Sequence, residues 1–215
     1  MADRDISVLT PATSQDLLTL DECKTLLSIS LGDTSRDAQL QMQISIASTA
    51  VADMANRKPE LGFGQTTVLE TWRETGNGRL FLMHWPVKVP NGIIQVTAGG
   101  VVLSSSDYTV DVNSGKMSMP TGGTWASPTV VQYTGGWTLP ASAPKPLKWA
   151  CAMMVQEQRI RNQQAQTAGI RLLAHKESRI AFYDPNAILI RQAGAKSTSI
   201  QIAEILVRPY MRLEV

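Results

Sequence analysis

The hydrophobic periodicity of this chain changes twice, which limits the folds open to it. Residues 40–54 carry apolar side chains at spacings of 4, 3, 4 and 3, as on one stripe of a helix. From about residue 66 to residue 133, short β-type runs alternate with Gly, Ser, Asn and Pro. Helical spacing returns after residue 144. We therefore expect an α+β protein, in which a β-rich module is inserted into a small helical body.

Helix start signals place the first two helices. Thr19 and Glu22 form a capping box in front of a short helix over residues 19–29. Thr34 and Asp37 have the same arrangement and predict the start of a longer helix that ends near residue 57. The stripe of this second helix has a further apolar edge beside it, formed by Met42, Ile46 and Ala50. A helix with two apolar edges usually packs against two neighbours, within the monomer or in an oligomer.

The middle of the chain predicts six or seven short strands in a sandwich or barrel-like module. The runs "TTVLETW" and "RLFLMHW" flank "GNG", which is a hairpin signal. In "YTVDVNSGKMSM" a three-residue turn would put Gly115 in the left-handed region.

The stretch "VVQYTGGWTLPASAPKPLKWACAMMV" returns the chain from strand to helix. Gly135 and Gly136 would supply a positive φ or a close backbone approach, and Pro146 suits a first helical turn. A helix face follows, made of Leu147, Ala150, Cys151, Met154 and Val155. The expected segments are an N-terminal arm at 1–16, a helical core at 17–60 and 144–168, the β-rich module at 61–143, and a C-terminal arm at 169–215. The last contains a short helix at 200–207 that Pro209 ends.

Catalytic and metal-binding signals are weak in this sequence. Its two histidines, His84 and His175, are each more typical of structural or surface positions than of catalysis. Cys23 and Cys151 lie in apolar helical patterns, which indicates buried reduced thiols. No zinc, phosphate-loop or nucleophile-elbow motif occurs, and we expect no enzyme, cofactor or metal site.

Charge separates the two ends of the chain. Residues 1–143 hold 9 Lys and Arg against 13 Asp and Glu, whereas residues 144–215 hold 11 against 5. The positive C-terminal third could face an acidic neighbour or nucleic acid, or could be a solvated polar surface. No apolar run reaches the length of a membrane span, and the N-terminus does not resemble a signal peptide.

Several phrases, in this order, resemble the head–tail adaptor (connector) proteins of tailed bacteriophages, the HK97- and SPP1-like neck adaptors. "LTLDECKTLLSI" resembles the opening helix of that family, and "DAQLQMQISIASTAVADMANR" resembles its second helix. The apolar strand with Trp-Pro-Val, the strand-to-helix return, "HKESRIAFYD" and "EILVRPYMRL" are similar to later parts. The resemblance covers about residues 17–210.

The resemblance implies a structural role in the virion neck. Such adaptors form a ring, generally a dodecamer, under the portal protein, extend the DNA channel used in genome ejection, and present a surface for a stopper or tail-completion protein. Assembly would take place in the bacterial host cytoplasm. The implied partners are therefore the portal protein, the next neck component, further copies of this chain, and the packaged DNA by non-specific proximity.

Site residues follow as hypotheses. For portal docking we expect Arg208, Pro209, Tyr210 and Arg212, and a deletion of residues 200–215 is expected to abolish docking yet leave a folded monomer. For subunit contact we expect Met42, Ile46, Ala50 and Trp137, although ordinary monomer core explains each of them equally well. Arg159 and Arg161 could face the channel.

Two alternatives remain open from the sequence. The chain could be another virion component, such as a stopper or tail-completion protein; stoppers are mostly β, so helix content near a third or above favours the adaptor. It could also be an unrelated enzyme or carbohydrate-binding module, which would need a pocket lined by convergent polar groups.

Overall fold

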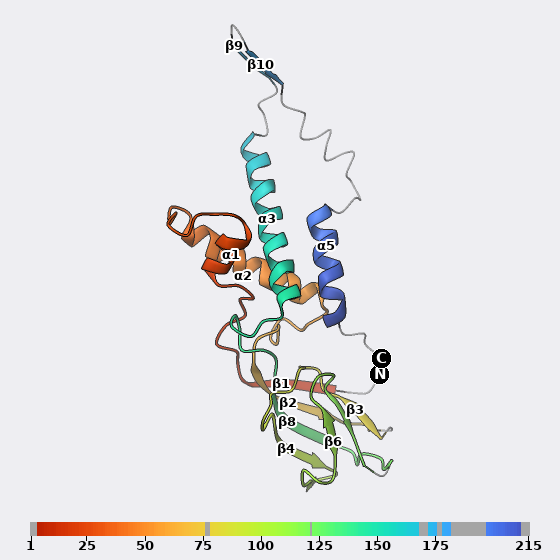
Figure 1. Cartoon of the computed structure of the whole chain (residues 1–215). Helices are drawn as coiled ribbons and strands as arrows, with labels where there is room; N and C mark the ends of the chain where they lie inside the picture. The colour runs from red at the N-terminus through yellow and green to blue at the C-terminus, as the bar shows by residue number, and fades with distance from the viewer. Residues whose placement is uncertain are drawn as a thin grey trace. The chain divides into compact units, whose positions relative to one another are not determined.

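The computed structural model describes residues 4–75, 78–120, 122–167, 172–175, 178–181 and 197–211. Helices and antiparallel sheets are both present, which confirms the α+β class (Figure 1). The chain divides into two compact units, each made from segments far apart in sequence. A β unit comprises Met1–Leu17 and Asn56–Ala143, and a helical unit comprises Leu18–Ala55 and Pro144–Val215.

The β unit contains two antiparallel sheets. The larger sheet has the order β1-β2-β8-β4-β5, formed by β1 (Arg4–Thr10), β2 (Thr66–Trp72), β8 (Thr129–Gly135), β4 (Ile93–Ala98) and β5 (Val101–Val102). The smaller has the order β3-β7-β6, formed by β3 (Arg79–Phe81), β7 (Lys116–Ser118) and β6 (Thr109–Asp111).

Alternation along the central strands decides which face is buried. In β2 and β8 every second side chain is buried, and the register places Val68 opposite Tyr133 and Glu70 opposite Val131. One hydrophobic cluster contains residues of both sheets, as in a sandwich; Met117 of β7 is fully buried in it.

Two local expectations for this unit are wrong or need revision. The predicted hairpin across "GNG" is absent: β2 pairs with β1 and β8, whereas β3 pairs with β7 in the other sheet. Local turn composition could not foresee this, because the strand partners are distant in sequence. Residues 4–10, placed in an N-terminal arm, instead form the edge strand β1. The β6–β7 hairpin is confirmed, with Gly115 at φ +68°.

The helical unit contains α1 (Leu20–Leu26), α2 (Asp37–Met54), α3 (Lys145–Thr167) and α5 (Thr198–Val207). The capping box of Thr19 and Glu22 is confirmed in both directions. The second predicted box is wrong, because Arg36 occupies the N-cap of α2 and makes no side-chain cap bond. Asp37 instead lies 2.5 Å from the ammonium group of Lys24.

The predicted stripe of α2 packs against α3 and forms the core of the helical unit. The fully buried core residues include Ile44, Ala47, Val51, Leu147, Ala150, Cys151 and Val155. Cys23 and Cys151 are both buried thiols, as expected, and neither forms a disulfide. Burial raises the pKa of the Cys23 thiol, which makes it a poor nucleophile at neutral pH.

Gly135 and Gly136, in the strand-to-helix return, have the predicted close backbone approach and positive φ. A Cβ at Gly135 would lie 2.0 Å from the carbonyl oxygen of His84, so only glycine fits there. Gly136 has φ +88°, a conformation that favours glycine. The helix α3 then begins with Pro146 in its first turn.

The C-terminal helix is longer than predicted and packs on α3. It starts at Thr198 with Ser197 as N-cap, and a 3-10 turn, η1 (Arg208–Tyr210), follows it. The short strands β9 (Leu172–His175) and β10 (Ser178–Ala181) form an antiparallel pair. In the part of the chain that the structure describes, no helix has the length and apolar character needed to cross a membrane.

Candidate functional site

The helical unit exposes apolar side chains on three helices, although its core is complete. On α2, Met42 is 66% exposed and Ile46 is 50% exposed, one turn apart on the face opposite Ile44 and Val51. Ala50 is half-buried at the end of the same edge. The predicted second edge of α2 is therefore surface in the single chain, not monomer core.

The helix α3 carries a second exposed stripe. Trp149, Met153 and Ile160 lie at helical spacings of 4 and 7, so they share one face. Trp149 is 42% exposed and Ile160 is also exposed. The sequence pointed to the opposite, buried face of this helix and did not single out this stripe.

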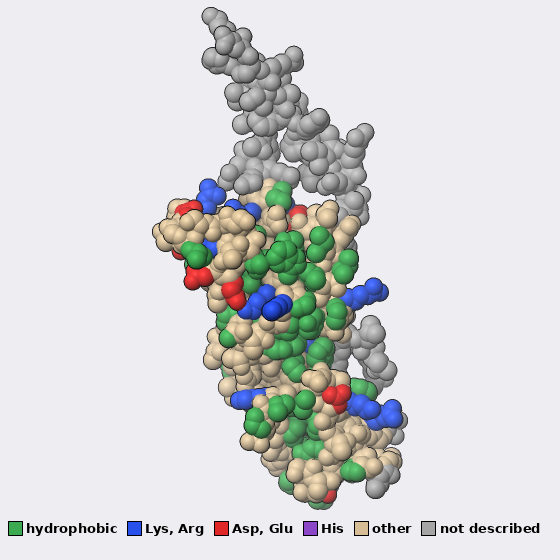
Figure 2. Space-filling view, viewed as in Figure 1, with side chains coloured by type: hydrophobic (Ala, Val, Ile, Leu, Met, Phe, Trp, Pro, Cys, Tyr) green, Lys and Arg blue, Asp and Glu red, His purple; other side chains and the backbone are tan. Residues whose placement is uncertain are grey.

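The helix α5 adds a third exposed apolar group. Ala203 and Val207 are fully buried, whereas Ile202 is exposed and Ile205 is 69% exposed. Figure 2 shows hydrophobic side chains gathered over α3 and α5. A contiguous exposed apolar patch often marks an interaction surface.

The predicted portal-docking residues follow α5 directly. Arg208 and Pro209 are exposed in the 3-10 turn, and Tyr210 is partly buried, which raises the pKa of its hydroxyl. Arg212 lies outside the described residues. Because Ala203 and Val207 are core residues, deleting residues 200–215 would remove part of the core of the helical unit. The expectation that such a deletion leaves a folded monomer is therefore abandoned.

Trp137 belongs to the β unit and lies in an aromatic cluster there. Its ring centroid is 5.8 Å from that of Phe63 and 6.2 Å from that of Trp85. The guanidinium of Arg57 lies 4.3 Å from the centroid of the Trp85 ring and donates to the Trp85 carbonyl oxygen. Trp137 is only half-buried, so part of its surface is exposed in the single chain.

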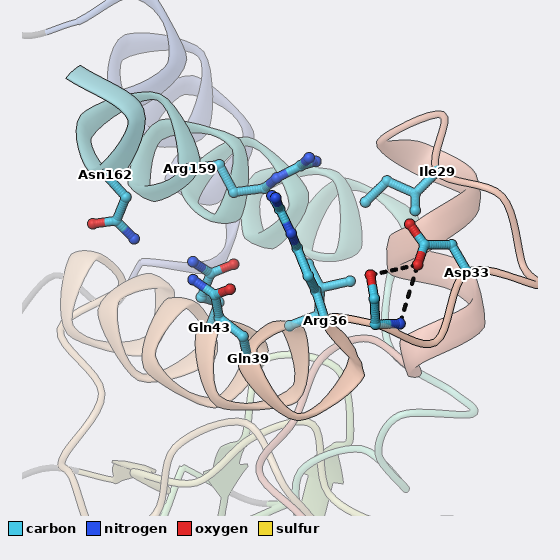
Figure 3. Close-up of a pocket in the computed structure, with 9 residues that line it drawn as sticks. Ile29, Asp33, Arg36, Gln39, Gln43, Arg159 and Asn162 are labelled. Carbon is cyan, nitrogen blue, oxygen red and sulfur yellow. Dashed lines mark hydrogen bonds between the residues drawn. The ribbon is translucent and has the colours of Figure 1, made fainter. Parts of the chain in front are cut away.

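A polar pocket lies between the start of α2 and residues 159–162 of α3 (Figure 3). It has a volume of about 360 Å³ and is lined by Ile29, Asp33, Ser35, Arg36, Gln39, Leu40, Gln43, Arg159 and Asn162. The figure shows Arg36 and Arg159 reaching into the same space from different helices. Sequence reasoning did not predict this convergence, because Arg36 and Arg159 are 123 residues apart.

Arg159 and Arg161, grouped as channel-facing by the sequence, have different surroundings. Arg159 lines the pocket, whereas Arg161 is an exposed side chain whose Nε donates to the Glu157 carboxylate at 2.9 Å. Burial favours the neutral form of Glu157, but hydrogen bonds from Arg161, Ser197 and Ser199 outweigh it and lower its pKa.

A buried polar network in the β unit was also missed by sequence reasoning. His84 is fully buried; its backbone N–H donates to the Tyr133 hydroxyl and its Nε2 lies 2.9 Å from the Gly64 carbonyl oxygen. The Tyr133 hydroxyl and the backbone N–H of Met83 both donate to Glu70. Desolvation and the positive charge of Arg57 lower the pKa of His84 to about 4. These bonds fix the segment after β3 to the main sheet.

No group of His, Cys, Asp and Glu among the described residues could hold a metal ion. The Asp111 carboxylate accepts hydrogen bonds from the Asn113 backbone N–H and the Ser114 hydroxyl, which satisfy it locally. The described residues offer exposed apolar groups on three helices and a pocket that two arginine side chains line.

Among known proteins, solved structures resemble this chain in fold, whereas no match is found by sequence. No protein-family profile matches it, and no curated protein matches it in sequence. Three solved structures contain similar chains, each aligned over 98% of this chain. One comes from the neck of an empty gene transfer agent (GTA) particle computed with C6 symmetry, with a TM-score of 0.55, 15% identity and 97% of that chain covered. The protein shares its fold with these chains.

The other two structures agree with the first. One is the virion of a native GTA particle, with a TM-score of 0.54, 12% identity and 96% coverage of that chain. The other is the neck of a native GTA particle computed with C12 symmetry, with a TM-score of 0.51, 11% identity and 97% coverage. The alignments span both units of the chain and the whole order of its elements.

Proposed function

We propose that this protein is a structural component of a virion neck and acts as a head–tail adaptor. The observation that carries the proposal is the fold likeness to neck chains over nearly the full length of both proteins. The exposed apolar groups on α2, α3 and α5 support it, because a subunit of a ring must present surface to its neighbours.

A ring requires two different faces on each subunit, since the contact between neighbours is head-to-tail. The α2 edge of Met42, Ile46 and Ala50 supplies one candidate face. The stripe of Trp149 and Ile160 on α3 supplies a second, on another helix. We propose that these apolar groups contact neighbouring copies, with a dodecamer as the expected assembly. Trp137 remains a subunit-contact hypothesis for the β unit.

Portal docking is proposed for the turn after α5. Arg208 and Pro209 are exposed, and the partly buried Tyr210 follows them in the sequence. This turn therefore carries a positive charge and an aromatic ring within three residues. Arg212 continues the same stretch of sequence. In the channel, exposed Arg161 is the better candidate to face DNA, because Arg159 is held in the pocket.

The decisive experiment is co-expression with the cognate portal protein, followed by negative-stain imaging. A second ring stacked coaxially on the portal is expected. Portals without a second ring, beside free monomer, would contradict the adaptor role and favour a later neck component.

Docking residues are then tested within the same assay. The double change Arg208→Ala and Tyr210→Ala should reduce portal-bound rings, because it removes charge and an aromatic contact without touching Ala203 or Val207. Arg79→Ala, an exposed arginine of the β unit, serves as control. Equal loss in the control would refute the assignment.

A stopper or tail-completion protein is the second candidate function. The described helices α1, α2, α3 and α5 hold 7, 18, 23 and 10 residues of the 215, which falls short of a third of the chain. Helix content therefore does not separate the two candidates. A stopper would bind only after the adaptor ring is in place, so an assay with portal alone distinguishes them.

A further inference from the structure

The pocket between α2 and α3 presents two guanidinium groups to one space. Arg36 stands at the N-cap of α2, and Arg159 is half-buried on α3. In Figure 3 Arg36 rises toward Arg159, with the pocket's amide side chains to one side of the pair. Two positive charges in one pocket repel each other, and an anion that lies between them offsets this repulsion.

The lining adds hydrogen-bond donors that suit an oxygen ligand. Gln39, Gln43 and Asn162 supply side-chain amides. Gln43 is only 6% exposed, and its side chain lines the pocket. Its amide adds a hydrogen-bond donor beside the two guanidinium groups.

The charge of the pocket selects the ligand. Asp33 also lines it, and hydrogen bonds from the Ser35 side chain and backbone lower the pKa of Asp33, which keeps it ionised at neutral pH. Two guanidinium groups and one carboxylate leave one positive charge. A single carboxylate balances that charge and matches the planar fork of a guanidinium. A DNA duplex would bring further phosphates toward Asp33, because it carries a charge about every 1.7 Å.

We propose that this pocket binds an Asp or Glu side chain of a second polypeptide. The choice of a polypeptide as the source rests on the proposed role in a neck assembly. The carboxylate lies between Arg36 and Arg159, and Gln43 donates its amide N–H to it. The exposed apolar side chains of the helices supply contact area, and the carboxylate bound in the pocket fixes the position of the second polypeptide on this surface.

The test uses the full-length free protein and side-chain NMR signals of arginine Nε–H and glutamine amide groups. The probe is N-acetylglutamate N′-methylamide, a blocked amino acid with one carboxylate; the matching glutamine compound is the blank. Saturable shifts are expected for Arg36, Arg159 and Gln43 with the first compound only. Shifts with both compounds, or with neither, would overturn the proposal.

Variants make the test specific. Arg36→Gln, on the surface, should weaken the probe about tenfold, the loss typical of one charge-assisted contact. Arg159→Gln should do the same, and Arg159→Lys provides a second variant that keeps the charge. Arg161→Gln, two residues away and outside the pocket, should bind normally. A loss in Arg161→Gln equal to that in Arg36→Gln would refute the site.

Two competitors separate the possible anions. Inorganic phosphate or a short DNA duplex that binds more tightly than the probe, at the same signals, would overturn the choice of carboxylate. Since this titration uses the free chain, its failure is distinct from a failure to form rings on the portal.

Discussion

At the residue scale, His84 couples the stability of the β unit to pH. It is buried and neutral, with a pKa near 4 against an ordinary value of 6.5, because desolvation and Arg57 disfavour its charged form. Between these two values the unfolded chain binds a proton that the folded chain does not. Stability contributed by the neutral histidine is therefore complete above pH 6.5 and is lost as pH falls toward 4.

His84→Gln should make the acid loss of stability shallower. A difference of about 2.5 pKa units corresponds to roughly 3 kcal/mol of unfolding free energy between pH 7 and pH 4 in the wild type. The variant lacks this component, although it is less stable at pH 7. Urea denaturation at a series of pH values measures the slope, and identical slopes in both proteins would contradict the assignment.

Gly135 tests the close approach in the strand-to-helix return. Gly135→Ala places a Cβ 2.0 Å from a backbone oxygen, which has to move, so a loss of about 3 kcal/mol or more is expected. Gly123→Ala is the matched control, since its nearest neighbour would be 3.7 Å away. Thermal unfolding should separate the two variants, and similar melting temperatures would show that the backbone yields easily.

At the element scale, the helix starts differ in how they are stabilised. Thr19 accepts from the backbone N–H of Glu22, and Glu22 accepts from that of Thr19. At α2 the corresponding hydroxyl of Thr34 takes no part in capping, and Asp33 instead bonds Ser35. Lys24, 1% exposed, pairs with Asp37 and ties α1 to α2.

Thr19→Ala should therefore cost about 1 kcal/mol of stability, the usual worth of an N-cap side chain. Thr34→Ala should change stability by less than about 0.5 kcal/mol, since the backbone carbonyl of Thr34, which accepts from Asp37, is kept. Chemical denaturation of both variants checks the pair. A larger loss in Thr34→Ala would mean that the start of α2 is capped after all.

At the scale of the whole molecule, the helical unit has apolar surface that its own fold does not bury. The double change Met42→Gln and Ile46→Gln should leave monomer stability within about 0.5 kcal/mol, because both side chains are exposed. Ring formation on the portal should fall sharply, since every subunit repeats the lost contact. Negative-stain counts of portals with a second ring measure the effect.

The control for that change lies in the β unit. Val101 and Val102 on β5 are 63% and 61% exposed, so their replacement by Gln removes a similar apolar area elsewhere. Rings should persist in this control. If both double variants lose rings equally, apolar area in general and not the α2 edge governs assembly.

Elements whose signals are local could be predicted from the sequence. The capping box of Thr19, the buried stripe of α2 and the left-handed Gly115 each depend on neighbours within a few residues. Periodicity also identified the buried stripe of α2, because a helix repeats every 3.6 residues. The α+β class followed from these patterns.

Which distant segments come together depends on the tertiary fold and could not be predicted from the sequence. Strand β2 pairs with β1 and β8 instead of β3. Arg36 and Arg159 line the same pocket although they are 123 positions apart in the sequence. The burial of Glu70, His84 and Tyr133 as one network likewise depends on how two sheets pack. Pairing and packing energies depend on three-dimensional neighbours, which no local pattern of residues encodes.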